Sequence, residues 1–182
     1  MTVTSNAQMD RQLEAYLAEL RAQFGPECLV SLTLNAVQAI DEAGLQPLLQ
    51  GNTRWDTNPR TLLTILTHCY GVGLYNPSDI ETAIERDPVV SYLAARRYPS
   101  AAVLRRFRRE HRALLQQALV NMFLRVWAAA SLGFNPQAMG PAEWEAALEQ
   151  AAMPPGLEIQ LNRLAVEPIL LAQLWDGPAL RD

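Results

Sequence analysis

The chain has 182 residues, of which 49% are hydrophobic and 19% charged, and its formal net charge is -4. This length allows one sizeable hydrophobic core, and no run of eighteen apolar residues that could span a membrane occurs in it. Residues 1–10 lack the basic and apolar stretches of a signal peptide, and Cys28 and Cys69 show no paired spacing. We therefore expect a cytoplasmic protein with no membrane contact, buried thiols, no disulfide framework and no four-cysteine zinc site.

The N-terminal segment, residues 1–57, shows the spacing of amphipathic helices. Apolar residues recur at steps of three and four over residues 7–24, which predicts a helix that stops at Gly25-Pro26. A second helix is predicted from about Glu27 to Ala43, with Gly44 as its stop. The loop expected after it carries apolar residues that indicate packing onto the body of the protein: Leu48, Leu49 and Trp55.

Three helix starts then follow within thirty residues. Asn58-Pro59, Asn76-Pro77 and Asp87-Pro88 each place a side chain that can accept the free amides of a first turn before a proline suited to the first helical position. The predicted helices cover about 59–71, 78–86 and 88–96.

Ser100 opens the longest helical segment, whose apolar spacing holds until Gly133. It is either one long helix or two helices broken near Arg112. Residues 58–135 are therefore predicted as a helical domain with a helix-turn-helix-like centre and a long helix from about residue 100.

Residues 136–182 are predicted as a helical tail. The segment 142–151 is a helix, and Met153-Pro154-Pro155-Gly156 is a linker. The last apolar segment contains Pro168, which removes an amide donor and clashes with the preceding turn, so we expect a kink or two short helices there. Because no run alternates with period two and β-branched residues are few, the predicted fold class is all-α.

The charges are unevenly placed, and all fifteen basic residues are arginine. Residues 1–95 carry five arginines against eleven acids, and residues 113–182 carry three against seven. Residues 96–112 carry seven arginines against Glu110 alone. The whole-chain isoelectric point of about 5.2 argues against nucleic acid, but this stretch has the local basic footprint that phosphate binding needs.

A helix from Ser100 would separate this charge from the core. Its arginines fall on one broad face, and Leu104, Phe107 and His111 fall on the other. Two short helices and the turn at Tyr98-Pro99 precede it, giving a helix-turn-helix shape in which Ser100 and the first-turn amides meet a phosphate. The predicted DNA-binding residues are Arg60, Arg96, Arg97, Ser100, Arg105, Arg106, Arg108, Arg109 and Arg112.

Several motifs in this region resemble one family over roughly residues 50–135. They are Asn58-Pro59-Arg60 with the LLTIL run, Gly71 and Gly73, Ile80-Glu81, Tyr92-Leu93, and Pro99 followed by Arg106-Phe107-Arg108 and His111. They are similar to the N-terminal domain of insertion-sequence DDE transposases. The family usually has an acidic or polar residue after the proline and a Ser-Thr pair before the aliphatic residue, where this chain has Ser100, Ala102 and Val103. The resemblance implies a helical domain that binds terminal transposon DNA and helps the protein to self-associate.

We expect no counterpart of the catalytic half of such a transposase in residues 136–182. That half is a ribonuclease-H-like domain whose three acidic residues hold two magnesium ions, whereas residues 136–182 show no strand pattern. His68 and Cys69 are adjacent and so point in different directions on a helix, which disfavours a zinc site or a Cys-His nucleophile; we interpret His68 as a core or interface histidine. We expect no enzymatic activity, no metal and no cofactor.

Two functions stay open. The first is an accessory or regulatory protein that binds double-stranded DNA, and the second is a helical homo-oligomeric assembly module that no longer binds DNA. The apolar richness of residues 113–132 and 157–175 favours a homodimer in either case. DNA binding requires the arginines of residues 105–112 to be solvent-facing and unpaired, and the assembly module requires them to be buried in ion pairs with Glu81, Glu85 or the acids of the tail.

Overall fold

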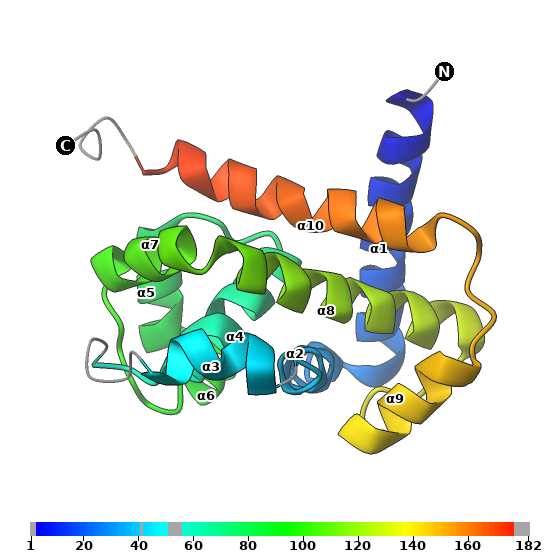
Figure 1. Cartoon of the computed structure of the whole chain (residues 1–182), viewed down its shortest axis with the longest axis horizontal. Helices are drawn as coiled ribbons and strands as arrows, with labels where there is room; N and C mark the ends of the chain where they lie inside the picture. Colours follow the sequence, from blue (N-terminus) through cyan, green and yellow to red (C-terminus); the bar gives the residue numbers. More distant parts are fainter. Residues whose placement is uncertain (1–2, 41, 51–55, 177–182) are drawn as a thin grey trace.

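A computed structural model describes residues 3–40, 42–50 and 56–176 (Figure 1). In these ranges the chain forms ten helices and no strand, which confirms the all-α prediction. None of these helices is both long enough and apolar enough for a membrane span. The helices are α1 (Val3–Phe24), α2 (Cys28–Gln38), α3 (Glu42–Gln50), α4 (Pro59–Gly71), α5 (Pro77–Arg86), α6 (Pro88–Leu93), α7 (Ala101–Glu110), α8 (Arg112–Leu132), α9 (Pro141–Gln150) and α10 (Leu157–Leu174).

The predicted helix starts are confirmed, and at each of them the side chain before the helix caps a free backbone amide. Asn58 accepts the amide two residues further on at 2.8 Å, and Asn76 does the same at 3.1 Å. Asp87 accepts the amide of Val89 at 2.8 Å, and Ser100 accepts that of Val103 at 3.4 Å. Because each cap satisfies an otherwise free amide donor, four boundaries follow from local sequence alone.

Helix α8 is the centre of the molecule. Helices α1, α2, α4 and α10 all pack against it, and α10 runs back along α8 in the opposite direction (Figure 1). One buried cluster draws on all three predicted segments, with Leu20, Leu63 and Ile169 at 2% exposure or less. Cys28 and Cys69 are buried free thiols, as expected. This shared core brings α7 close to the C-terminal end of α10. The position of that end determines which arginines of α7 have an acidic partner.

Of the two alternatives for the segment that starts at residue 100, the structure shows two helices and not the single long helix. The chain leaves helical geometry at His111, where φ is -123° and ψ is 35°, so that α7 and α8 are separate helices. The ring of His111 lies 4.8 Å from that of Phe107, which is fully buried. The break therefore lies near Arg112, at the position that the sequence left open.

Two other boundaries also differ from expectation. Gly44 does not stop a helix but lies inside α3, in the stretch predicted as a loop, because Leu45 and Leu48 are both buried on one side of that helix. Helix α10 continues through Pro168 as one element rather than two short helices. Pro168 and Ile169 are buried against the core, and this packing outweighs the missing amide donor. Trp55 lies outside the described residues.

Candidate nucleic-acid interface

Helix α7 carries most of the predicted DNA-binding residues and is held down by two core side chains. Leu104 and Phe107 are fully buried, and the hydrophobic face that they form follows the helical spacing of the sequence. At the start of α7, the carboxylate of Glu81 accepts the amide of Ala101 at 3.2 Å. Helices α5 and α7 are therefore joined by packing and by a charge-assisted hydrogen bond.

The hydrogen bond between Glu81 and the amide of Ala101 conflicts with the expectation that the first turn of α7 binds a phosphate. The Ser100 hydroxyl caps the amide of Val103, and Glu81 takes the amide of Ala101. A carboxylate thus occupies the end of the helix where a phosphate was expected, and it complements the partial positive charge of the helix N-terminus. Ser100 acts here as a helix cap.

Arg108 lies in the core, so its predicted place on the exposed face is wrong. Its side chain is 1% exposed, donates to the hydroxyl of Tyr70 at 3.1 Å and forms an ion pair with Asp176. Burial alone would lower the pKa of Arg108, but Tyr70 and the Asp176 carboxylate outweigh burial and raise it. Arg108 follows Phe107 and stands four residues after Leu104, so it lies at the edge of the buried face, where an acid from the tail reaches it.

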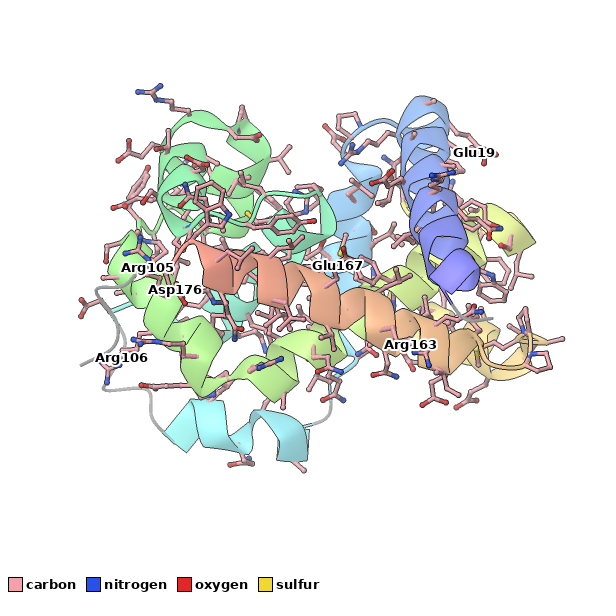
Figure 2. All side chains as sticks on the ribbon, turned by 90° about the horizontal axis from the view of Figure 1, so that it is seen from above. Glu19, Arg105, Arg106, Arg163, Glu167 and Asp176 are labelled. Atoms are coloured by element: carbon pink, nitrogen blue, oxygen red, sulfur yellow. The ribbon has the colours of Figure 1, made fainter. Side chains whose placement is uncertain are left out.

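Arg105 and Arg106 are also paired with acids, and Figure 2 shows Arg105 next to Asp176. The Nε atom of Arg105 lies 3.8 Å from the same carboxylate of Asp176, and 29% of the side chain is exposed. The Nε of Arg106 donates to Glu110 at 3.0 Å within α7. Asp176 is the second residue after α10, so an acid of the tail neutralises part of the positive charge of α7.

Five of the predicted arginines remain exposed. Among the residues that the structure describes, none of the five guanidinium groups forms an ion pair or a hydrogen bond. Arg96 and Arg97 lie in the turn between α6 and α7 and are called the turn arginines below. Arg109 and Arg112 flank the α7–α8 break and are called the break arginines. The fifth is Arg60, in the first turn of α4.

Two exposed tyrosines accompany the turn arginines. Tyr92 is 68% and Tyr98 is 63% exposed, and both lie within four residues of Arg96. The backbone between them is left-handed at Ala95 and Arg96, with φ of 50° and 58°. Such geometry is costly for residues with a Cβ and clusters at functional positions. These tyrosines were not among the predicted contact residues. Their closeness in sequence to the arginine pair could have indicated them.

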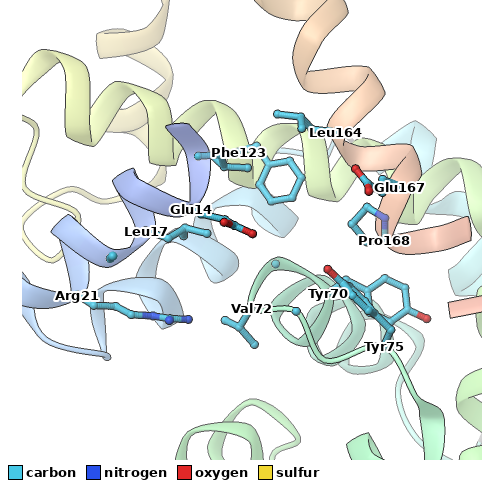
Figure 3. A pocket seen from close by; sticks show the side chains of 14 residues that line it. Glu14, Leu17, Arg21, Tyr70, Val72, Tyr75, Phe123, Leu164, Glu167 and Pro168 are labelled. Atoms are coloured by element: carbon cyan, nitrogen blue, oxygen red, sulfur yellow. The ribbon is translucent and has the colours of Figure 1, made fainter. Parts of the chain in front are cut away.

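The pocket between α1, the end of α4 and α10 has a different character (Figure 3). Its volume is about 470 Å³, and its wall includes the carboxylates of Glu14 and Glu167 together with Arg21. Burial raises the pKa of the Tyr75 hydroxyl there, and the charges of Glu167 and Glu14 raise it further. Two carboxylates against one guanidinium repel a phosphate, so this pocket is no part of an anion-binding surface.

His68 and Cys69 have no arrangement for nucleophilic chemistry. Burial raises the pKa of Cys69 to about 12, so the thiol stays protonated at neutral pH. Nδ1 of His68 lies 3.2 Å from the Thr33 hydroxyl, which itself donates to the carbonyl of Leu29 at 2.7 Å. Within the described ranges, no three His, Cys, Asp or Glu side chains lie together as a metal would need. His68 is thus a core residue held by one polar contact.

This burial predicts a pH dependence of stability. Burial lowers the pKa of His68 to about 4 in the folded protein, against 6.5 for an exposed histidine. The unfolded chain therefore binds the additional proton between these values, and stability present above pH 6.5 is lost as pH falls toward 4, by up to about 1.4 kcal/mol per pH unit. Urea denaturation at a series of pH values should show this slope, and His68→Gln should reduce it. An unchanged slope in that variant would assign the titration to another group.

Comparison of the chain with protein-family models, with curated proteins and with solved structures finds no match. The transposase resemblance therefore stays a prediction from the motifs between Asn58 and His111. What the geometry adds is a division of the predicted residues. Arg105, Arg106, Arg108 and Ser100 are engaged within the chain, whereas the turn arginines, the break arginines and Arg60 are open to solvent.

Proposed function

We propose that the protein binds double-stranded DNA through the turn arginines and the break arginines, as an accessory or regulatory relative of a transposase N-terminal domain. The observation that carries this proposal is the set of four exposed guanidiniums with no acidic partner in the described chain. An unpaired surface guanidinium gains most from a phosphate, because the contact releases a condensed counterion from the DNA.

The neighbouring acids strengthen this interpretation. Glu81 is bound to the start of α7, Asp176 to Arg108 and Arg105, and Glu110 to Arg106. These carboxylates are therefore engaged with other groups of the chain. The net charge of -4 is spread over the remainder of the chain, and it is the local field that a phosphate meets.

Tyr92 and Tyr98 fit the same surface. A tyrosine hydroxyl donates to the phosphate oxygens of a duplex. Both side chains are more than 60% exposed beside Arg96 and Arg97. An exposed aromatic pair next to two cations is a typical composition for nucleic-acid contact.

A binding experiment with matched variants tests this proposal. Fluorescence anisotropy of a labelled random duplex at low salt should give a Kd roughly tenfold weaker for Arg109→Ala/Arg112→Ala and for Arg96→Ala/Arg97→Ala, equivalent to about 1.4 kcal/mol for each pair. The control is Arg11→Ala/Arg21→Ala on α1, which removes the same charge from exposed positions elsewhere. An equal loss of affinity in the control would mean that the net charge of the protein, and not the position of these arginines, determines binding.

The assembly module is the second candidate, and one observation favours it. Asp176, an acid of the tail, forms ion pairs with Arg105 and with the buried Arg108, which is the arrangement expected for arginines that support structure. Absence of DNA binding at low salt, together with a dimer in sedimentation equilibrium, would support this second function. Both candidate functions require α7 to be folded, so the measurement that distinguishes them is DNA binding.

A further inference from the structure

A glycine turn at the end of α4 places Tyr75 beside the core. Gly73 has a φ of 86°, and its amide donates to the carbonyl of Tyr70 at 3.2 Å. The amide of Leu74 donates to the carbonyl of Cys69 at 2.8 Å, which completes a Schellman motif. The ring of Tyr75 then packs edge-on against that of Tyr70, with 5.9 Å between the ring centroids. This turn forms one wall of the pocket between α1, α4 and α10.

The other walls of that pocket combine an apolar surface with two carboxylates. Glu14 projects from α1 and Glu167 from α10, and Figure 3 shows both side chains at the pocket. The apolar surface consists of Leu13, Leu17, Phe123, Leu164 and Pro168. We call this space the carboxylate pocket. Its volume of about 470 Å³ lies within the range of about 300–1,000 Å³ that is typical of small-molecule sites.

The charges of the carboxylate pocket are unbalanced. Arg21 is the one cation among its lining residues, and in the described part of the chain neither Arg21 nor the two glutamates form an ion pair. The Tyr70 hydroxyl already accepts from Arg108, whereas the Tyr75 hydroxyl lies near the charges of both glutamates. Like charges that line one partly enclosed space repel each other, and a bound cation removes this cost.

We propose that the carboxylate pocket binds a small organic cation, an amine whose positive charge is held by Glu14 and Glu167 and whose hydrocarbon part lies on the apolar surface. The carboxylates and the Tyr75 hydroxyl supply acceptors for its N–H groups. An amine fits better than a bare metal ion, because only two carboxylates line the pocket and a metal would leave the apolar surface uncovered. This inference goes beyond DNA binding and does not depend on it, since the pocket contains none of the proposed DNA contacts.

Calorimetric titration with compounds of matched shape tests the charge preference. Phenethylamine and hexylamine, both charged at neutral pH, should bind to the wild-type protein. Phenethyl alcohol, which keeps the ring and the chain but lacks the charge, should bind at least about tenfold more weakly, and phenylacetate should not bind.

Variants of the lining charges test the location of binding. Glu14→Gln and Glu167→Gln keep the size of each side chain and should each raise the Kd for phenethylamine about tenfold. Arg21→Gln removes the competing cation and should lower that Kd roughly threefold, a gain that loss of structure would not produce. The control is Glu19→Gln, the same change at an exposed position of α1 outside the pocket, which should keep the wild-type Kd.

Four results would overturn the proposal. Absence of binding by both amines would mean that the pocket is not an amine site, and equal affinity for phenethylamine and phenethyl alcohol would remove the role of charge. Unchanged affinity in both pocket variants, or an equal loss in Glu19→Gln, would place binding elsewhere on the acidic surface. The break-arginine variant Arg109→Ala/Arg112→Ala should bind phenethylamine like the wild type, so failure of the DNA proposal and failure of this one are distinguishable.

Discussion

Replacing Phe107 with alanine should lower the free energy of unfolding by about 4 kcal/mol. The side chain is fully buried and forms, with Leu104, the apolar face by which α7 is attached to the core. Its ring also packs against His111 at a centroid distance of 4.8 Å, at the break between α7 and α8. Truncation leaves a cavity at the junction of two helices, where collapse would require α7 to move.

Urea denaturation measures this change, with the m value checked for constancy. Tyr98→Ala is the matched control, since it removes an aromatic side chain nine residues earlier that is 63% exposed. That variant should stay within about 0.5 kcal/mol of the wild type. A destabilisation below about 1 kcal/mol for Phe107→Ala would mean that α7 is not anchored by this residue.

Asp176→Ala should destabilise the fold by about 3 kcal/mol, because removing one partner of a buried ion pair leaves the other charge uncompensated. Arg108 is 1% exposed, and after the change the hydroxyl of Tyr70 would be its one acceptor among the residues that the structure describes. Arg105 would lose its carboxylate partner as well. The end of α10 is thus expected to matter to stability as much as a core residue does.

The control for this second change is Glu149→Ala, an exposed carboxylate near the end of α9 with no ion pair in the described chain. Thermal and urea unfolding should place that variant within about 0.5 kcal/mol of the wild type. If Asp176→Ala behaves the same way, the ion pair contributes nothing and Arg108 finds another partner. A simultaneous gain in DNA affinity would show that Asp176 competes with phosphate for Arg105.

The starts of the helices were predictable because their causes are local. Asn58, Asn76, Asp87 and Ser100 each satisfy an amide two or three residues away, so the chemistry lies within one turn of the chain. Helix α3 was missed because its stability comes from burying Leu45 and Leu48, which outweighs the presence of Gly44. The type of the capping residue indicates the first kind of cause, whereas the second depends on contacts with the rest of the core.

The candidate surface was predictable only in part, for the same reason. The concentration of arginines in residues 96–112 is visible in the sequence, but the partner of Arg108 is 68 residues further along the chain. The position of the end of α10 determines which guanidiniums have no acidic partner. That position depends on how the helices pack in the folded core. Glu81 at the start of α7 is a similar case, 20 residues from the amide that it accepts.

The salt dependence of DNA binding tests whether the break arginines contact phosphates. Anisotropy titrations of a random duplex at several salt concentrations should give a log-log slope that becomes shallower by about 1.8 when both break arginines are replaced by alanine, at about 0.9 for each phosphate that is no longer neutralised. The Arg11→Ala/Arg21→Ala control should keep the wild-type slope. Equal slopes for all three proteins, or no binding at the lowest salt, would contradict the assignment of this surface to DNA.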